Sequence, residues 1–408
     1  MLFVIVISLL LLAAFVFDIS SDAIKVPSVI LLLALGWVVH QGAKFFGADI
    51  PNLEPILPVI GTVGLILIVM EGSLELKLSK SKVNFILKVV SISLLSIVVF
   101  SGLATWVLVE YFGIEPRIAV INSIPFSIIS SAIAIPSVSS FTAKNKEFVI
   151  YESSLSDIFG VILFNFFALN EEITNHTFGV FTLEILTILI LTLVCTLGLA
   201  FLLKKIDHHV KFLPILLVVV LIYAVSKYFH LPALIFILLF GLYLGNFEKV
   251  GELGFLSKIE PEKFKDEIKK FKEITIEFAF LIRASFFLLF GYLLDAEELL
   301  NIQTMGFSVS IVIAIFVIRF IVLKLFKIDL LPVTFVAPRG LITILLFVSI
   351  PKHERIVFFN ESLVSQVILM TAFVMMFGLF FKRKEATNDL EIVHENESNE
   401  DIEQDFKD

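Results

Sequence analysis

Three features that this sequence lacks narrow the class of protein. Cys195 is the single cysteine among 408 residues, so no disulfide bond can form within the chain. No Lys or Arg precedes the apolar run 2–17 and no clear small-residue cleavage site follows it, so we interpret this run as a membrane span and not as a signal peptide. Short segments of strict alternation, which would indicate an outer-membrane barrel, are missing as well.

What the sequence does have is a series of long apolar runs. Hydrophobic residues make up 58% of the chain, 44 residues are Phe, and the mean hydropathy is +1.00. Soluble domains are only about 45–50% apolar, so the composition predicts an all-α polytopic membrane protein. We expect thirteen transmembrane helices, near residues 2–17, 26–40, 56–74, 84–112, 117–141, 148–169, 178–203, 212–229, 232–246, 274–295, 304–326, 332–350 and 361–381.

Lysine and arginine are unevenly distributed over the predicted connections. Connections after odd-numbered spans hold eighteen of them, and connections after even-numbered spans hold five. Because basic residues gather on the cytoplasmic side, this asymmetry predicts an outside N-terminus and a cytoplasmic C-terminus. The expected location is the cell's inner (plasma) membrane.

The transmembrane domain is predicted to cover residues 1–382, with two polar segments of different kinds. The connection 246–273 mixes seven Lys with seven acids and places Phe264, Ile268 and Phe271 at helical spacing, which predicts an amphipathic helix on the cytoplasmic surface. The tail 383–408 holds ten acids and, from Glu385 onward, a single Lys. Such a composition predicts a disordered cytoplasmic extension.

The apolar run 148–169 carries two acids, Glu152 and Asp157, in its interior. An ionised carboxylate near the bilayer centre costs about 2.5–3.5 kcal/mol even on a lenient scale, so such a residue is usually retained for a task. The two acids lie about 140° apart around a helix, so one can face a cavity while the other meets a neighbouring helix. Salt bridges that only fix helix packing are the alternative for both acids.

Two predicted spans are interrupted. The span 117–141 contains Pro136 among serines that include Ser130 and Ser131, and the span 332–350 contains Pro338, Arg339 and Gly340. Backbone groups freed by such residues are tolerated at membrane depth only where they line a cavity or are buried in protein. These are the fifth and twelfth predicted spans, which lie seven spans apart. An odd offset predicts two inverted-topology repeats with broken helices five and twelve, an arrangement that marks the ion site of secondary transporters. Simple proline kinks are the alternative.

Four motifs, in chain order, resemble those of the monovalent cation:proton antiporters, in particular the thirteen-span sodium/proton antiporters and exchangers. The motifs are Met-Glu-Gly-Ser-Leu-Glu-Leu at 70–76, Glu-Ser-Ser-Leu-Ser-Asp at 152–157, Arg319 in the eleventh span, and Ala-Pro-Arg-Gly at 337–340. They are spread over the whole predicted membrane domain. Each motif is weak alone, and together they are fairly specific.

The resemblance implies a homodimer with an interface domain and a moving core, and a transporter without a cofactor or enzymatic activity. It also implies that Asp157 binds either the cation or protons and alternates its access. Two positions depart from the family pattern. The Asn that precedes the aspartate is Ser156 here, and the Thr-Asp-Pro of the broken fifth helix is Ala134-Ile135-Pro136, which leaves no acid there. Ion preference therefore does not follow from the resemblance, and Na⁺, with Li⁺ possible, is our expectation.

The residues themselves support a competition mechanism. Burial favours the neutral form of Asp157 while a nearby cation favours the charged form, so H⁺ and Na⁺ should compete for this carboxylate. Hard oxygen ligands suit an alkali cation, and we expect Ser156, Ser130, Ser131 and backbone carbonyls to complete the site. Because a single acid is present, we expect electroneutral exchange, one charge for one.

The remaining buried charges should pair in the core. An unpaired buried charge is costly, and Arg283, Arg319 and Arg339 are available as partners for two acids. We expect Glu152 to bridge to Arg319 or Arg339, and Glu71 to take the other arginine.

Several other functions are less consistent with the sequence. A potassium/proton antiporter of the same fold is the nearest alternative, and only a comparison of Na⁺, Li⁺ and K⁺ transport would separate the two. No segment resembles the selectivity ring of an ion channel. An intramembrane zinc protease would need a second His after His353-Glu354, which is missing. The expected partners are a monovalent cation, protons and membrane lipid, and no nucleic acid.

Overall fold

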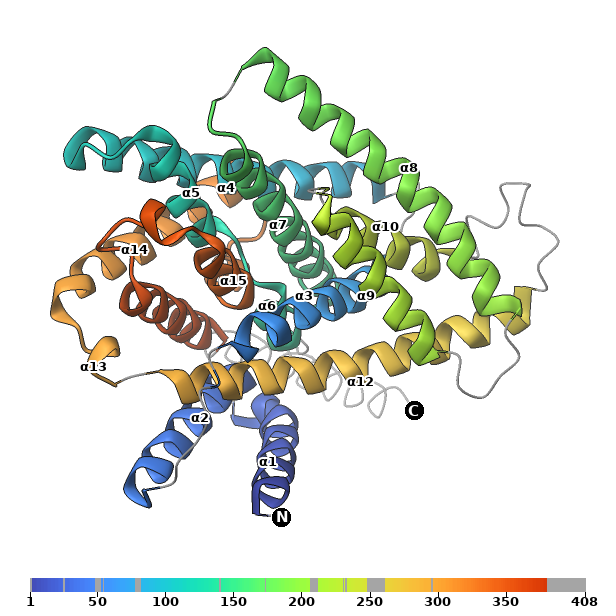
Figure 1. Ribbon diagram of the computed structural model, residues 1–408, viewed down its shortest axis with the longest axis horizontal. Coiled ribbons are helices and arrows are strands. Elements are labelled where there is room, and N and C mark those ends of the chain that lie inside the picture. Colours follow the sequence, from blue (N-terminus) through green and yellow to red (C-terminus); the bar gives the residue numbers. More distant parts are fainter. Residues whose placement is uncertain are drawn as a thin grey trace, which may run out of the picture.

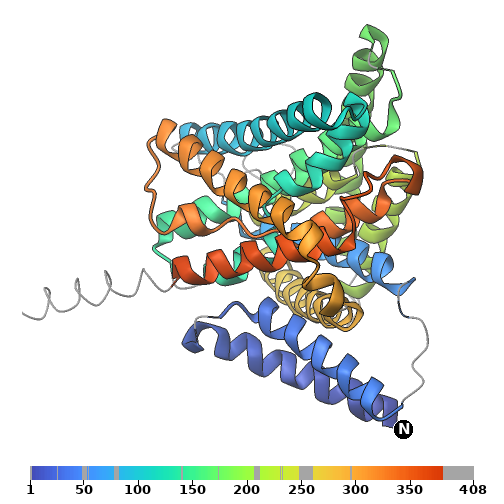
Figure 2. The same cartoon turned by 90° about the vertical axis from the view of Figure 1, so that its left-hand side faces the viewer.

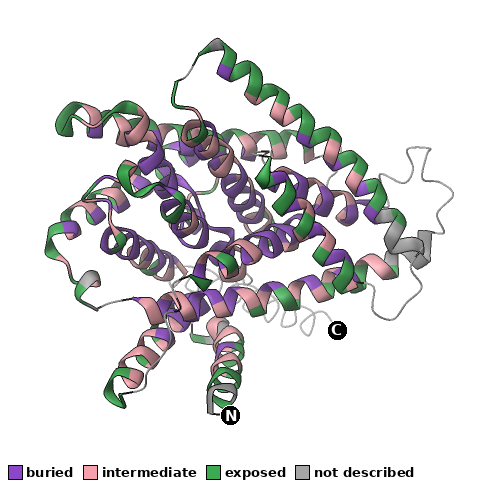
Figure 3. Ribbon diagram, viewed as in Figure 1, coloured by how far each residue is buried: buried purple, intermediate pink, exposed green. Residues whose placement is uncertain are grey.

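The computed structural model describes residues 2–24, 26–47, 53, 55–77, 82–138, 141–172, 174–205, 212–229, 231, 233–247, 261–294 and 296–379. All regular structure in these ranges is helical, and the helices pack around a buried centre (Figures 1 and 3). The predicted acidic tail 383–408 lies outside the described residues, as does most of the first half of the predicted connection 246–273.

Helices occupy all thirteen stretches that the hydropathy predicted. Nine helices in the described residues are long and apolar enough to span a membrane, and three more apolar helices are shorter. The remaining stretch is the interrupted one near Pro338. The helices are α1 Leu2–Ile24, α2 Ser28–Phe45, α3 Ile56–Glu75, α4 Val83–Phe112, α5 Pro116–Ser127, α6 Ser131–Ser137, α7 Ala143–Leu169, α8 Asn175–Lys205, α9 Phe212–Tyr228, α10 Leu234–Gly245, α12 Pro261–Leu293, α13 Ala296–Leu299, α14 Ile302–Leu325, η2 Val333–Phe335, α15 Leu341–Ser349, η3 Lys352–Glu354 and a last helix, Glu361–Leu379.

The contacts divide the helices into two groups, which we call the site lobe and the flanking lobe. The site lobe contains α4, α5, α6, α7, α14, η2 and α15, together with the last helix, which hydrogen-bonds to α14 and to Arg339. The flanking lobe contains α1, α2, α3, α8, α9, α10 and α12. In Figure 2, α1 and α2 lie along one edge of the molecule, next to α12. Helix α3 also contacts α6, α7 and α15, so it forms the seam between the lobes.

Glycines allow close helix crossings in the flanking lobe. A Cβ atom at Gly36 would lie 2.2 Å from the carbonyl oxygen of Leu288, and one at Gly291 would lie 2.3 Å from that of Leu33. Helices α2 and α12 therefore cross backbone to backbone. Gly241 and Gly245 of α10 bring that helix equally close to α3, a small-residue spacing that is common between membrane helices.

The predicted connection 246–273 is helical from Pro261 onward, in the part that the structure describes. Residues 261–273 are the first turns of α12 and continue without interruption into the span predicted at 274–295. Phe271 is 0% exposed and lies between the rings of Phe212 and Phe240, with centroids 6.4 and 6.3 Å away. The apolar spacing is therefore explained, at Phe271, by packing against α9 and α10.

Candidate functional site

Asp157 lies near the middle of α7 and is only 1% exposed. Its Oδ2 atom accepts hydrogen bonds from the backbone nitrogen of Ser131, at 3.3 Å, and from the Ser131 hydroxyl group. Its Oδ1 atom has no hydrogen-bond partner among the described residues. A buried carboxylate with one oxygen left over can accept a proton or a cation.

The chain opposite Asp157 is the extended segment between α5 and α6. The backbone nitrogen of Ile129 donates to the Ser156 hydroxyl at 2.9 Å, and the backbone nitrogen of Ser130 donates to the carbonyl oxygen of Pro338 at 2.9 Å. The Ser130 hydroxyl has no partner in the described part of the chain. The interruption predicted near Pro136 thus begins earlier, at Ile128, and Pro136 itself lies inside α6.

The second interruption lies between η2 and α15 and crosses the first. Arg339 donates to the carbonyl oxygens of Phe126 (2.7 Å), Ser127 (3.2 Å) and Ala337 (2.8 Å). Its guanidinium group therefore covers the last carbonyls of α5, where a cation is favoured by the helix dipole. A cavity of about 20 Å³, room for roughly one water molecule, lies beside Arg339, Arg319 and Ser127.

Glu152, the other acid of α7, is also buried but fully paired. Both of its carboxylate oxygens accept hydrogen bonds from Arg319 of α14, at 2.7 and 2.8 Å. Arg319 also donates to the carbonyl oxygen of Val333 in η2. This bidentate ion pair joins α7 to α14 and to the second interruption. Bidentate geometry with further hydrogen bonds is what makes a buried ion pair tolerable.

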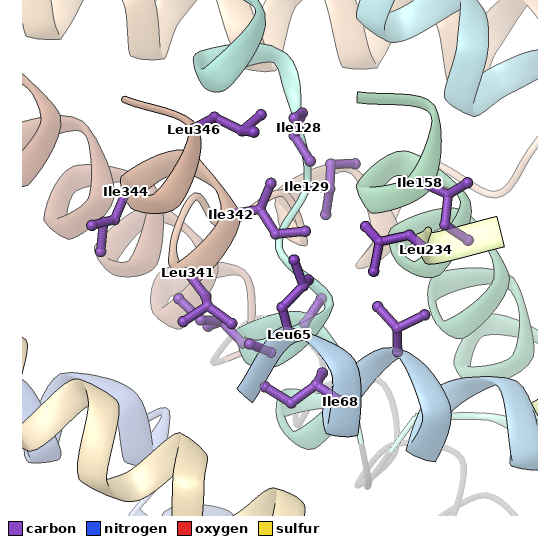
Figure 4. Packing of buried hydrophobic residues seen from close by; sticks show 14 of the residues in the cluster. Leu65, Ile68, Ile128, Ile129, Ile158, Leu234, Leu341, Ile342, Ile344 and Leu346 are labelled. Carbon is purple, nitrogen blue, oxygen red and sulfur yellow. The ribbon is translucent and has the colours of Figure 1, made fainter. Parts of the chain in front are cut away.

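Apolar side chains surround the crossing of the two interruptions. Figure 4 shows Ile128 and Ile129 facing Ile342 and Leu346 of α15, with Ile158 of α7 and Leu65 and Ile68 of α3 around them. Ile128 packs directly on Gly160, because a Cβ atom at Gly160 would lie 2.2 Å from its Cδ1 atom. Ile128 therefore packs against α7 one turn beyond Asp157, toward the Leu169 end of the helix.

Comparison with known proteins agrees with this geometry. Residues 6–383 match the family model described as "Sodium/hydrogen exchanger, transmembrane". The chain belongs to the sodium/hydrogen exchanger family. Its members are transporters that exchange cations for protons and are not enzymes, and the chain is accordingly a multi-pass membrane protein.

The fold is also that of a solved antiporter. Two structures of the sodium proton antiporter MjNhaP1 from Methanocaldococcus jannaschii, one at pH 8 and one an electron microscopy map, each match with a TM-score of 0.67 and 16% identity. The first match covers 93% of this chain and 95% of that one, and the second covers 95% and 96%. No curated protein sequence matches the chain. At this identity the likeness establishes the fold of this exchanger and leaves its ion preference open.

The pairing expected for Glu71 of this exchanger is wrong. Glu71 lies 3.6 Å from Arg283 of α12 and does not pair with Arg339, which donates to backbone carbonyls instead. The reason is the packing of α3, whose Glu71 side faces α12 while Arg339 sits at the crossing of the site lobe. Of the two arginines considered for Glu152, the structure brings Arg319 to it.

Two features of the exchanger were not anticipated from its sequence. Ser154, one turn before Asp157, is completely buried, and its hydroxyl has no partner among the described residues. Arg117, counted only as a loop charge, donates to the carbonyls of Phe167, Ala168 and Asn170 at the end of α7 and pairs with Glu354 at 2.9 Å. The one sequence signal for these Arg117 contacts was its position at the start of α5, beside the predicted end of α7.

Proposed function

We propose that this exchanger trades a monovalent cation, most readily Na⁺, for H⁺ at Asp157. The observation that carries the proposal is a buried carboxylate at the crossing of two interrupted helices, whose Oδ1 atom has no partner in the described residues. Such a carboxylate can hold a proton or a metal ion, and each excludes the other. Competition of this kind makes the movement of one ion depend on the other.

The proposed cation ligands are oxygens around Asp157. Ser131 already contacts the carboxylate, and Ser156 precedes Asp157 in the chain. The Ser130 hydroxyl has no partner within the described part of the chain. Oxygen ligands of this kind suit Na⁺ and Li⁺. Because the serines are neutral, Asp157 is the single exchangeable charge of the site, and the exchange is one cation for one proton and electroneutral. The roles of Glu152, Arg319, Glu71 and Arg339 are structural in this proposal.

Alternating access is proposed to occur between the two lobes. The site lobe consists of three spans around each interruption, α4 to α7 and α14 to the last helix, and this supports two inverted repeats. We also propose the topology derived from the lysine distribution, with an outside N-terminus and a cytoplasmic C-terminus in the plasma membrane. Residues 1–382 then form the transporter and 383–408 a cytoplasmic extension, and the functional unit is a homodimer.

The test is a proton-gradient assay in everted membrane vesicles with Na⁺, Li⁺ or K⁺ added separately. Wild type should dissipate the gradient with Na⁺ and Li⁺, and Asp157→Asn should do so with none of the three cations. The apparent KM for Na⁺ should rise as the pH falls, because protons compete for the same carboxylate. Exchange by Asp157→Asn at the wild-type rate would contradict the proposal. A response to K⁺ above that to Na⁺ would assign the potassium alternative, and a transport current in proteoliposomes would contradict electroneutrality.

A further inference from the structure

We propose that Ser154 supplies an additional oxygen ligand to the transported cation, on the α3 side of Asp157. This inference rests on the proposed exchange at Asp157 and names a residue that determines the cation affinity of that site. It draws on three observations: a hydroxyl without a partner in the described residues, its position one turn from Asp157, and the close packing of Gly72 against it.

The hydroxyl of Ser154 is exceptional among the serines of α7. It is 0% exposed and has no hydrogen-bond partner in the described residues. The neighbouring Ser153 donates to the carbonyl oxygen of Val149 at 2.8 Å, and Ser156 accepts from Ile129 at 2.9 Å. Buried hydroxyl groups are normally paired, so an unpartnered one beside a buried carboxylate is a candidate cation ligand.

Ser154 stands where it could act together with Asp157. Residues three apart on a helix are neighbours on one face, about 5–6 Å between Cβ atoms. Within the described residues, the Oδ1 atom of Asp157 and the hydroxyls of Ser154 and Ser130 have no hydrogen-bond partner. One negative oxygen and two neutral ones form a ligand set for a small alkali cation.

Gly72 of α3 faces the Ser154 hydroxyl across the seam between the lobes. A Cβ atom at Gly72 would lie 3.0 Å from the Ser154 oxygen and 3.3 Å from Ile135 of α6. The missing side chain at Gly72 therefore lets α3 pack closely against the hydroxyl, which lies buried at the seam between the lobes. A Cβ atom at Gly72 would occupy the space next to this oxygen, so the glycine keeps that space free of an apolar group.

Because Ser154 is uncharged, its substitution should change the affinity for Na⁺ and not the stoichiometry of exchange. A lost hydroxyl weakens cation binding without changing the number of charges exchanged or the proton carrier. The affinity for Na⁺ should fall while one-for-one exchange persists. This differs from the expected effect of Asp157→Asn, which removes exchange itself, so the two proposals fail in distinguishable ways.

The experiment compares Ser154→Ala and Ser154→Cys with wild type in the vesicle assay, with Na⁺ and Li⁺ titrated. The cysteine variant nearly preserves the side-chain volume but replaces the hard oxygen by a soft sulfur, which is a poor ligand for Na⁺. Both variants should raise the apparent KM for Na⁺ by about tenfold, the equivalent of one lost ligand contact. Maximal rate and electroneutrality should be retained.

The matched control is Ser123→Ala. Ser123 of α5 is equally buried, but its hydroxyl is already used, donating to Ala119 at 2.7 Å. This variant should keep the wild-type KM. An unchanged KM in Ser154→Ala, or a wild-type KM in Ser154→Cys, would overturn the ligand role, since the second result would mean that Ser154 only fills space. If Ser154→Ala does not reach the membrane, Ser154→Cys alone decides between these outcomes.

Discussion

The backbone nitrogen of Ser130 donates a 2.9 Å hydrogen bond to the carbonyl oxygen of Pro338. Each residue lies in the extended part of an interrupted helix, so the two interruptions satisfy each other at the point where they cross. Unsatisfied backbone groups are costly in a membrane interior. The crossing explains why both interruptions can exist beside Asp157, and it ties α6 and α15 into one body.

Arg339 should be more sensitive to substitution than its charge alone suggests. Arg339→Lys keeps the charge but loses the planar fork that reaches three carbonyl oxygens at once. We expect a lower melting temperature of the purified protein and a clear loss of exchange. Arg355→Lys is the matched control, because Arg355 also donates to two carbonyls, those of Val348 and Ile350, but from a half-buried site. Equal effects of the two substitutions would contradict the role of Arg339 at the crossing.

The Glu152–Arg319 pair should matter far more for stability than an ion pair on the surface. Glu152→Gln leaves the buried Arg319 without its carboxylate partner, and breaking such pairs costs about 3–5 kcal/mol. Lys144 and Asp329 form a control pair at 2.8 Å, with side chains 74% and 61% exposed. Asp329→Asn should cost less than about 1 kcal/mol. Thermal unfolding in detergent measures both, and an unaffected Glu152→Gln protein would show that the buried pair is dispensable.

Gly36 should be irreplaceable, whereas Gly42 of the same helix should not be. A Cβ atom at Gly36 would come within 2.2 Å of a backbone oxygen of α12, which cannot rotate away, whereas one at Gly42 would meet nothing within 4 Å. Gly36→Ala should therefore separate α2 from α12 and cost about 1–3 kcal/mol or more. Gly42→Ala should be neutral or stabilise the helix by about 0.5–1 kcal/mol. Melting temperatures of the two variants, compared in one detergent, test the close crossing.

Gly160 should be required for Ile128 to pack against α7 beside the site. In Gly160→Ala the new methyl group would meet Ile128, so we expect slower exchange and lower stability. Adding Ile128→Ala removes the clashing atoms and should restore part of the rate in the same vesicle assay. Gly102→Ala is the control, because a Cβ atom there has nothing within 4 Å. Failure of the double variant to recover any activity would argue against this contact as the cause.

Around Asp157, the local features could be predicted from the sequence but the long-range hydrogen-bond partners could not. The apolar runs, the two interruptions and the unusual acids could be recognised, because hydropathy, proline and glycine act locally along the chain. The sequence predicts the break near Pro136, whereas the extended segment lies at 128–130, where hydrogen bonds to Ser156 and Pro338 hold it. Those partners come from spans far apart in the sequence, so no local pattern could indicate them.

Apolar runs long enough to span a bilayer determined the helices and their order, because any such segment in a membrane must satisfy its own backbone. The sequence alone also determined that a carboxylate would lie within one of them. Tertiary packing decided which charges meet, pairing Glu71 with Arg283 and Glu152 with Arg319. It also decided which oxygens remain unpartnered around Asp157, because hydrogen-bond partners depend on how α3, α5, α7 and α15 approach one another in space.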